Sequence, residues 1–300
     1  MREYSSSEHV DMSDEIIKLE KRCEKLKKDV YSNLTSWQQV QLARHPERPY
    51  TLDIVKRIAT RFHEMHGDRS FADDKAIVGG MATIEGQHIM LIGHQKGRGT
   101  KNNLYRNFGM PNPEGYRKAL RLMKLAEKFQ KPILALIDTP GAYPGKGSEE
   151  RGVAEAIAVN LREMTMLKVP VICIVTGEGG SGGALAIAIG DKVLMLENAI
   201  YSVISPEGCA AILLRDGTKG NVMAESLKIT AQNLYELGVI DGIIKEPVGG
   251  AHRNYDEVCE TLKWTILSEL KKLQEKTPEE RIDQRIKKFG AMGDYIQDNK

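Results

Sequence analysis

The 300-residue chain is poor in cysteine and has no strong excess of either charge. Its four cysteines are Cys23, Cys173, Cys209 and Cys259. No two of them form a CxxC pair, which excludes the commonest zinc and redox motifs, and scattered cysteines are typical of a reducing compartment. The 43 basic and 41 acidic side chains nearly cancel. This balance argues against a dedicated nucleic-acid binder, because such proteins usually carry a basic excess.

Long hydrophobic runs are also missing. No segment has the roughly eighteen consecutive apolar residues of a membrane helix. Residues 1–15 lack the apolar core of a signal peptide. The remaining composition, 41% hydrophobic and 28% charged, is that of an ordinary globular protein. We therefore expect a cytoplasmic protein without membrane association.

The spacing of apolar residues predicts a helical N-terminal part. Residues 13–30 form a charged helix with one apolar stripe, which would lie on a larger body or another subunit, or remain solvated. After a Pro-rich break, Thr51 caps a predicted helix over 52–66. Two β segments at 76–84 and 88–93 suggest a hairpin or a ββ corner. Residues 94–112 are read as a basic loop.

From residue 113 onward, helices and strands alternate. Helices are predicted after Asn112, from Ser148, and over 184–189 and 222–237. The continuous apolar runs expected to be buried strands are 133–137, 171–175, 193–196 and 239–244. This order predicts a parallel sheet covered by helices on both faces. We expect three parts: a helical arm over 1–50, an α/β domain over 51–255 and a helical extension over 256–300.

The segment GEGGSGG at 177–183 stands between a predicted strand and a predicted helix. Glycines allow a sharp turn and a close approach of a ligand to the backbone. The first amides of a helix have no internal partner, and the helix dipole adds positive character. The segment is therefore a candidate site for an anion or a developing oxyanion.

Short motifs in this region allow other interpretations. Residues 177–182 match GxGxxG, but two strand–helix units precede them, which is unusual for a dinucleotide site. Residues 179–183 match the GxSxG nucleophile elbow, so a serine hydrolase using Ser181, His252 and either Asp191 or Asp241 is the alternative function. Ser181 is otherwise a simple helix N-cap. The DTPG sequence at 138–141 resembles a GTPase loop, but no P-loop precedes it.

Several longer motifs resemble one family, the alpha subunits of acetyl-CoA carboxylase carboxyltransferase. The resemblance covers about residues 13 to 270. It rests on RPYTLDIV at 48–55, GHQKGRGTKNNLYRNFGMPNPEGYRKALRLMKLAEKF at 93–129, IDTPGAYPGKGSEERG at 137–152, GEGGSGGALAIAIGD at 177–191 and YSVISPEGCAAIL at 201–213. It implies a crotonase-like fold, a spiral of repeated ββα units with helical N- and C-terminal extensions.

The resemblance also implies a function and partners. The chain would transfer a carboxyl group from carboxybiotin, held on biotin carboxyl carrier protein, to acetyl-CoA, giving malonyl-CoA for fatty acid biosynthesis. A beta subunit with a zinc ribbon would complete the site in an alpha2-beta2 heterotetramer, and biotin carboxylase would belong to the wider complex. Biotin enters as a substrate, and no metal is expected on this chain. Such chemistry needs oxyanion holes rather than a side-chain nucleophile.

The family motif and the loop chemistry together nominate the site residues. The candidates are Gly182 and Gly183 as oxyanion-hole donors, Gly179 and Gly180 as residues that shape the turn, and Gly141 and Ala142 as a second pair of amides. The second pair is otherwise a tight structural turn. A basic run of Lys96, Arg98, Lys101 and Arg106 is interpreted as a contact for CoA phosphates, the transferred carboxylate or a partner, or as a solvated surface.

Overall fold

The computed structural model describes residues 13–293 and is built on one eight-stranded mixed sheet. The order is β1-β2-β3-β4-β5-β6-β8, and β7 pairs with the end of β5. The strands are β1 (Arg61–Glu64), β2 (Ile77–Ile84), β3 (Gln87–His94), β4 (Ile133–Thr139), β5 (Val171–Gly180), β6 (Lys192–Leu196), β7 (Ile200–Ser202) and β8 (Gly242–Ile244). The first three are antiparallel and the remaining pairs are parallel, as the alternating pattern predicts.

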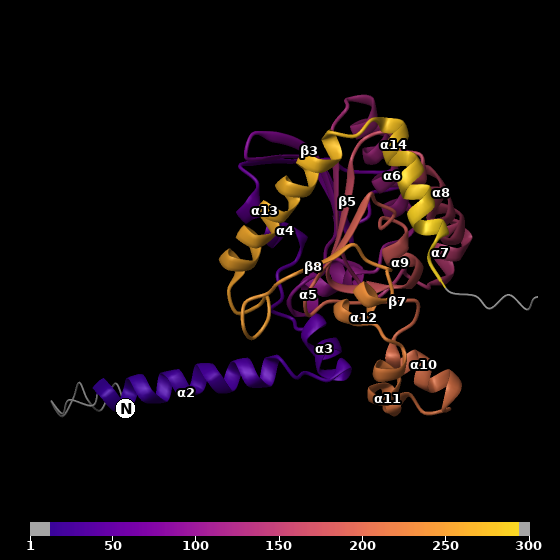
Figure 1. Cartoon of the computed structure of the whole chain (residues 1–300). Helices are drawn as coiled ribbons and strands as arrows, with labels where there is room; N and C mark the ends of the chain where they lie inside the picture. Colours follow the sequence, from indigo (N-terminus) through magenta and orange to yellow (C-terminus); the bar gives the residue numbers. More distant parts are fainter. Residues whose placement is uncertain (1–12, 294–300) are drawn as a thin grey trace, which may run out of the picture.

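Helices cover both faces of the sheet (Figure 1). One face carries α4 (Thr51–Ile58) and α13 (Tyr255–Gln274), and the other carries α6 (Pro113–Lys128), α8 (Val153–Thr165) and α14 (Pro278–Gly290). Strand β4 is buried at every position, because helices pack on both sides of it. Side chains of α13 join the same core as the strands. The division of the chain at residues 50 and 255 stays a prediction.

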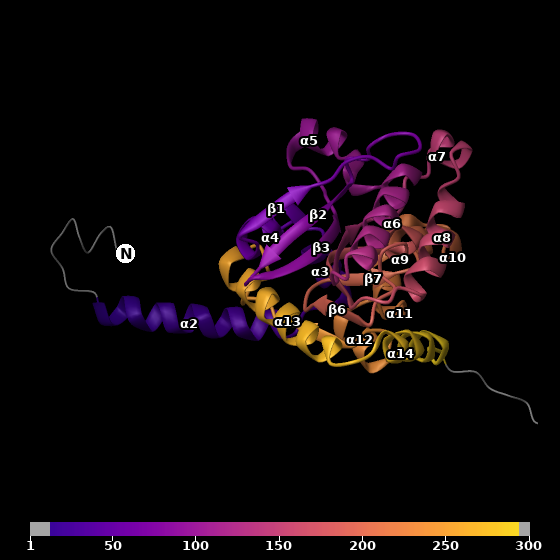
Figure 2. The same cartoon turned by 90° about the horizontal axis from the view of Figure 1, so that it is seen from above.

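The short helices gather near the carboxyl end of β5. They are α3 (Ser36–Ala43), α5 (Gly99–Tyr105), α7 (Lys146–Glu150), α9 (Ser181–Leu185), α10 (Pro206–Leu213), α11 (Gly220–Ser226) and α12 (Ala231–Glu236). Helix α2 (Ser13–Tyr31) extends away from the body in both views (Figures 1 and 2). The helix predicted over 13–30 is therefore confirmed.

Several predicted elements differ from the structure. The helix predicted over 52–66 ends at Ile58, and β1 follows, because pairing with β2 overrides the local helical pattern. The approach of β1 requires glycine at 80, where a Cβ would lie 2.0 Å from the His63 carbonyl oxygen. The helix predicted over 222–237 is broken into α11 and α12, since Thr230 caps a new helix. The basic loop at 94–112 contains α5.

The glycine-rich loop is also shorter than predicted. Strand β5 continues through Gly180 instead of ending at Val175, because β7 pairs with Glu178, Gly179 and Gly180. The helix predicted from Ser148 divides at Gly152, whose φ of +77° favours glycine.

Candidate active site

The glycine segment at the end of β5 is packed between two side chains. A Cβ on Gly177 would lie 2.4 Å from a carboxylate oxygen of Asp138, and a Cβ on Gly179 would lie 2.7 Å from the Tyr201 ring. Only hydrogen fits at these two positions, so glycine lets β5 pass between its neighbours. The chain then turns at Ser181, whose φ of +49° is left-handed, and α9 begins there.

The turns that follow β4 (residues 140–142) and β5 (residues 180–183) touch each other through their backbones. We call this contact the junction. A Cβ on Gly180 would lie 2.1 Å from the Pro140 carbonyl oxygen. A Cβ on Gly183 would lie 2.5 Å from the Ala142 nitrogen and 2.9 Å from the Gly141 Cα. The two amide pairs nominated from the sequence therefore meet at one place in the structure, held there by contacts that tolerate no side chain.

The backbone amides of Ala142, Gly182 and Gly183 lie at this junction and have no hydrogen-bond partner within residues 13–293. The Gly141 amide differs, because it donates to the Thr139 hydroxyl at 3.1 Å. Free amides at a helix start, beside a second free amide, are suited to bind a negatively charged oxygen.

Gly182 is placed differently from Gly183. A Cβ on Gly182 would meet only the Ile157 side chain, at 3.4 Å, which is ordinary van der Waals contact. The sequence treated these neighbours alike. The structure shows that a methyl group at Gly183 forces the two turns apart, whereas one at Gly182 does not.

A line of alternating charges lies behind the glycine segment. The Lys96 ammonium is 2.7 Å from an oxygen of Asp138 and 2.8 Å from one of Glu178. The guanidinium of Arg44, the C-cap residue of α3, is 2.7 Å from the other Glu178 oxygen and also pairs with Glu207 of α10. These five residues, the charge cluster, connect β4, β5, α3 and α10 just beside the oxyanion-hole candidates.

The pKa shifts of Glu178 and Lys96 both favour the charged form of the side chain. Burial opposes the charge of Glu178, but Lys96 and Arg44 outweigh that effect and lower the pKa of the carboxyl. Burial likewise opposes the charge of Lys96, and Asp138 and Glu178 outweigh it and raise the pKa of the ammonium. Sequence reasoning missed Glu178 and Arg44, since nothing in the local pattern shows that they meet.

The basic run is largely used in internal contacts, which argues against the interpretation that all of it faces a ligand. Lys96 belongs to the charge cluster. Arg98 is 2.8 Å from a carboxylate oxygen of Asp53 and lies over the Tyr50 ring. Arg106 donates to a backbone carbonyl at 2.9 Å, while Lys101 is exposed.

His94, at the end of β3, lies under the junction and is completely buried. Neither ring nitrogen has a hydrogen bond of good geometry within the described chain, although the backbones of Gly183 and Leu136 influence the ring. Burial lowers the pKa of His94 to about 3, so the ring is neutral at physiological pH. The motif at 93–129 contains this residue, but nothing in the sequence assigned it a role.

The structure gives no support to a serine hydrolase. Ser181 has the left-handed backbone of a nucleophile elbow, yet no hydrogen bond joins its hydroxyl to a histidine in the described residues. Asp191 and Asp241 form ion pairs with basic side chains of α14, at 2.8 and 2.7 Å. His252 stacks on His45 with 3.9 Å between ring centroids. Ser181 is also not the N-cap of α9, because Gly180 holds that position.

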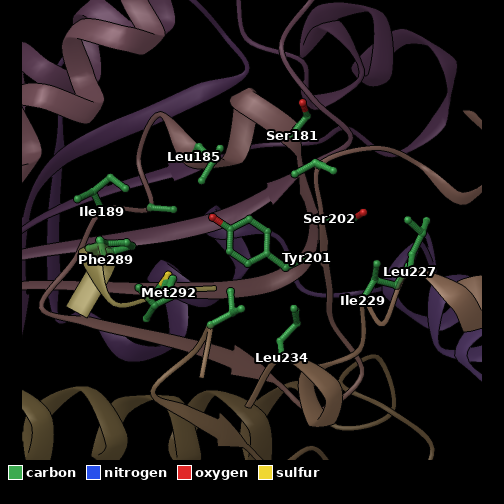
Figure 3. Close-up of a pocket in the computed structure, with 14 residues that line it drawn as sticks. Ser181, Leu185, Ile189, Tyr201, Ser202, Leu227, Ile229, Leu234, Phe289 and Met292 are labelled. Carbon is green, nitrogen blue, oxygen red and sulfur yellow. The ribbon is translucent and has the colours of Figure 1, made fainter. Parts of the chain in front are cut away.

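An apolar cavity of about 340 Å³ adjoins α9 (Figure 3). Tyr201 lies in its middle, with Leu185 on one side and Phe289 and Met292 of the C-terminal region on another. Burial raises the pKa of Tyr201, so its hydroxyl stays protonated. A smaller cleft opens among Arg44, Pro140 and the glycines.

Among residues 13–293 no cluster of histidine, cysteine and carboxylate side chains suits a metal ion, and no helix is long and apolar enough to cross a membrane.

Comparison with solved structures shows the fold. The chain superimposes on transcarboxylase 12S with a TM-score of 0.60 and 19% identity, covering 75% of this chain and 41% of that one. It superimposes on the beta subunit of geranyl-CoA carboxylase from P. aeruginosa with a TM-score of 0.58 and 21% identity, covering 82% and 46%. The chain therefore shares the fold of these two structures, and the predicted crotonase-like fold class is confirmed.

Comparison with sequences shows the family. The model for acetyl co-enzyme A carboxylase carboxyltransferase-like proteins matches residues 1–293. The chain is 58% identical to the acetyl-coenzyme A carboxylase carboxyl transferase subunit alpha of Geobacter metallireducens, over 97% of this chain and 92% of that protein. It is 56% identical to that of Listeria monocytogenes, over 98% and 93%. These matches, together with the paired amide turns, show that the chain belongs to the family of acetyl-CoA carboxylase carboxyltransferase alpha subunits.

Proposed function

We propose that the amides of Ala142, Gly182 and Gly183 form an oxyanion hole for the ureido oxygen of biotin. The observation that carries the proposal is that these three amides are free and lie on two turns locked together by backbone contact. Gly180 shapes the junction, and Gly179 lets β5 approach β7. The Gly141 amide stabilises the turn instead, because it donates its hydrogen bond to the Thr139 hydroxyl.

This arrangement suits carboxyl transfer. Biotin brings the carboxyl group, and its ureido oxygen gains negative charge as that group leaves. The protein then has to orient that oxygen and stabilise its charge, and one preorganised amide donor contributes about 3 kcal/mol to lowering such a barrier. The donors need no rearrangement, because the junction fixes them before the substrate arrives. The side chain of Ser181 has no role as a nucleophile in this reaction.

The acceptor half of the site is supplied by another chain. The family name identifies an alpha subunit of acetyl-CoA carboxylase carboxyltransferase, and a beta subunit carrying a zinc ribbon would hold acetyl-CoA. The carboxyl group would come from biotin on its carrier protein, charged by biotin carboxylase, and the product would be malonyl-CoA for fatty acid biosynthesis. We propose that two alpha and two beta subunits assemble, each alpha junction facing a beta subunit.

Carboxyl transfer from malonyl-CoA to biocytin tests this function. The formation of acetyl-CoA is followed with this chain alone, with the beta subunit alone and with both. Turnover only in the mixture is expected. If the two folded chains associate without turnover, the shared-site proposal is wrong. Turnover by this chain alone would contradict the need for a beta subunit.

A further inference from the structure

Helix α2 carries an apolar seam that nothing in residues 13–293 covers. Leu19, Leu26 and Val30 are 50%, 55% and 58% exposed, and Cys23 is exposed between them. A shallow groove along the helix is lined by α2 residues alone. The helix projects from the body in both views (Figures 1 and 2). Apolar side chains in such a row mark a contact with another molecule.

The spacing of the seam selects another helix as the partner. Its residues are Ile16, Leu19, Cys23, Leu26 and Val30, separated alternately by three and four positions. This is the a/d pattern of a coiled coil, and the seam is too narrow to match the broader apolar face of a helix that packs on a sheet. The positions between the seam residues carry charged side chains, except Ile17, which is 47% exposed.

The charges beside the seam determine the orientation. A parallel pair of α2 helices in register would set Arg22 against Lys27 of the second copy, and Glu15 against Glu20. Both contacts repel. An antiparallel pair that places Leu26 against Cys23 of the second copy sets Arg22 against Asp29, which attracts. Sliding that pair by one heptad would set Arg22 against itself, so the charges fix the register as well as the direction.

We propose that α2 pairs antiparallel with α2 of a second copy of this chain, with Leu26 of each helix packed on Cys23 of the other. The contact is two-fold symmetric, so every attractive pair occurs twice. Leu19 then packs against Val30 of the second copy. The apolar residues that are solvated in the single chain become the layers of a short coiled coil.

Thiol cross-linking of the full-length chain tests the pairing, because Cys23 is exposed and the other three cysteines are buried. One protein is the wild type, and the other carries Leu26→Cys and Cys23→Ser. Each protein alone and their mixture, with a mass tag on one protein, are oxidised to form disulfides, which need the two Cβ atoms to lie about 4 Å apart. We expect cross-linked dimers only in the mixture. The matched control carries Lys21→Cys and Cys23→Ser on the outer face of the helix, and should not cross-link to the wild type.

Each other outcome overturns the proposal. Cross-linking of each protein with itself, and not in the mixture, would show a parallel pair. No cross-linking in any sample would show that the seam is covered by something else. Loss of the mixed product when the beta subunit is added would show that the beta subunit occupies the seam. These results do not depend on carboxyl transfer, so the failure of this proposal is distinguishable from that of the proposed function.

A charge exchange gives a second test. Arg22→Glu or Asp29→Arg alone should raise the dissociation constant of the dimer roughly tenfold, because two attractive pairs become repulsive. The double variant should restore it. Sedimentation velocity measures the constants, and equal weakening in the single and double variants would contradict the proposed register.

Discussion

The junction of the two turns and helix α2 are opposite extremes of packing in one chain. At the junction a Cβ on Gly180 would lie 2.1 Å from a carbonyl oxygen, so even one carbon atom does not fit. On α2, Leu26 is 55% exposed and lines a shallow groove formed by α2 residues alone. The junction is formed by segments within the chain, whereas the partner proposed for α2 is a second molecule. Substitutions should therefore affect stability and catalysis at the junction and affect only association on α2.

The largest expected effect is a loss of stability when the charge cluster beside the junction is broken. Lys96→Met leaves Asp138 and Glu178 as adjacent buried carboxylates without their shared cation. We expect the free energy of unfolding at pH 7 to fall by about 3–5 kcal/mol, the usual cost of breaking a buried ion pair. Urea denaturation measures it, and Lys101→Met is the matched exposed control. Equal stability of the two variants would show that the cluster does not hold the junction.

The two neighbouring glycines of α9 provide the next test. Gly183→Ala should lower kcat of the reconstituted enzyme about 10²–10³-fold, the range for losing one oxyanion donor, because its methyl group pushes Ala142 away. Gly182→Ala should cost less than about tenfold, since its methyl group only touches Ile157. Both variants are assayed for carboxyl transfer from malonyl-CoA to biocytin. Similar losses in the two would contradict the backbone contact as the cause.

The pH dependence of the free energy of unfolding should reveal that the buried His94 ring is neutral. The folded-state pKa of about 3 lies below the unfolded value of 6.5, so the unfolded chain binds more protons between these values. The contribution of His94 is fully present above pH 6.5 and is lost as pH falls toward 3, by about 1.4 kcal/mol per pH unit. His94→Gln should make the slope of unfolding free energy between pH 6 and 4 shallower by that amount. An unchanged slope would mean that the ring is not buried in its neutral form.

Ser181→Ala should have a smaller effect. The side chain is exposed and is not the N-cap of α9. We therefore expect no cap to be lost and less than about threefold loss of carboxyl transfer, well below the loss of one oxyanion donor. The assay with biocytin measures it. Complete loss of activity would instead support Ser181 as a nucleophile.

The smallest effect should come from α2. Leu19→Ala removes a half-exposed side chain with no partner inside the described chain. At a concentration where the chain is monomeric, the free energy of unfolding should change by less than about 0.5 kcal/mol. A loss as large as that of a core leucine, about 2–5 kcal/mol, would show that α2 packs on the body.

Much of the site could be predicted because its residues are local in sequence. The glycines of 177–183 and the glycine-containing turn at 141–142 predict tight backbone geometry, because glycine allows sharp turns and close backbone contacts. The apolar strands of the parallel sheet were predicted for the same reason, since a buried strand needs a continuous apolar run. Strand β1 was missed because residues 61–64 have a pattern compatible with a helix, and only pairing with β2 makes them a strand.

The sequence by itself determined the family, the parallel core and the candidate amides, because long motifs and apolar periodicity are properties of neighbouring residues. Only the tertiary structure decided which amides remain free. The Gly141 amide donates to the Thr139 hydroxyl and is therefore not free. Gly182 and Gly183 differ in the space around them, because Gly182 faces the Ile157 side chain and Gly183 faces the backbone of residues 141–142. The charge cluster was likewise decided in three dimensions, since Arg44 and Glu178 are 134 positions apart. Contacts of this kind depend on how β4, β5 and α3 pack, and no local pattern encodes that.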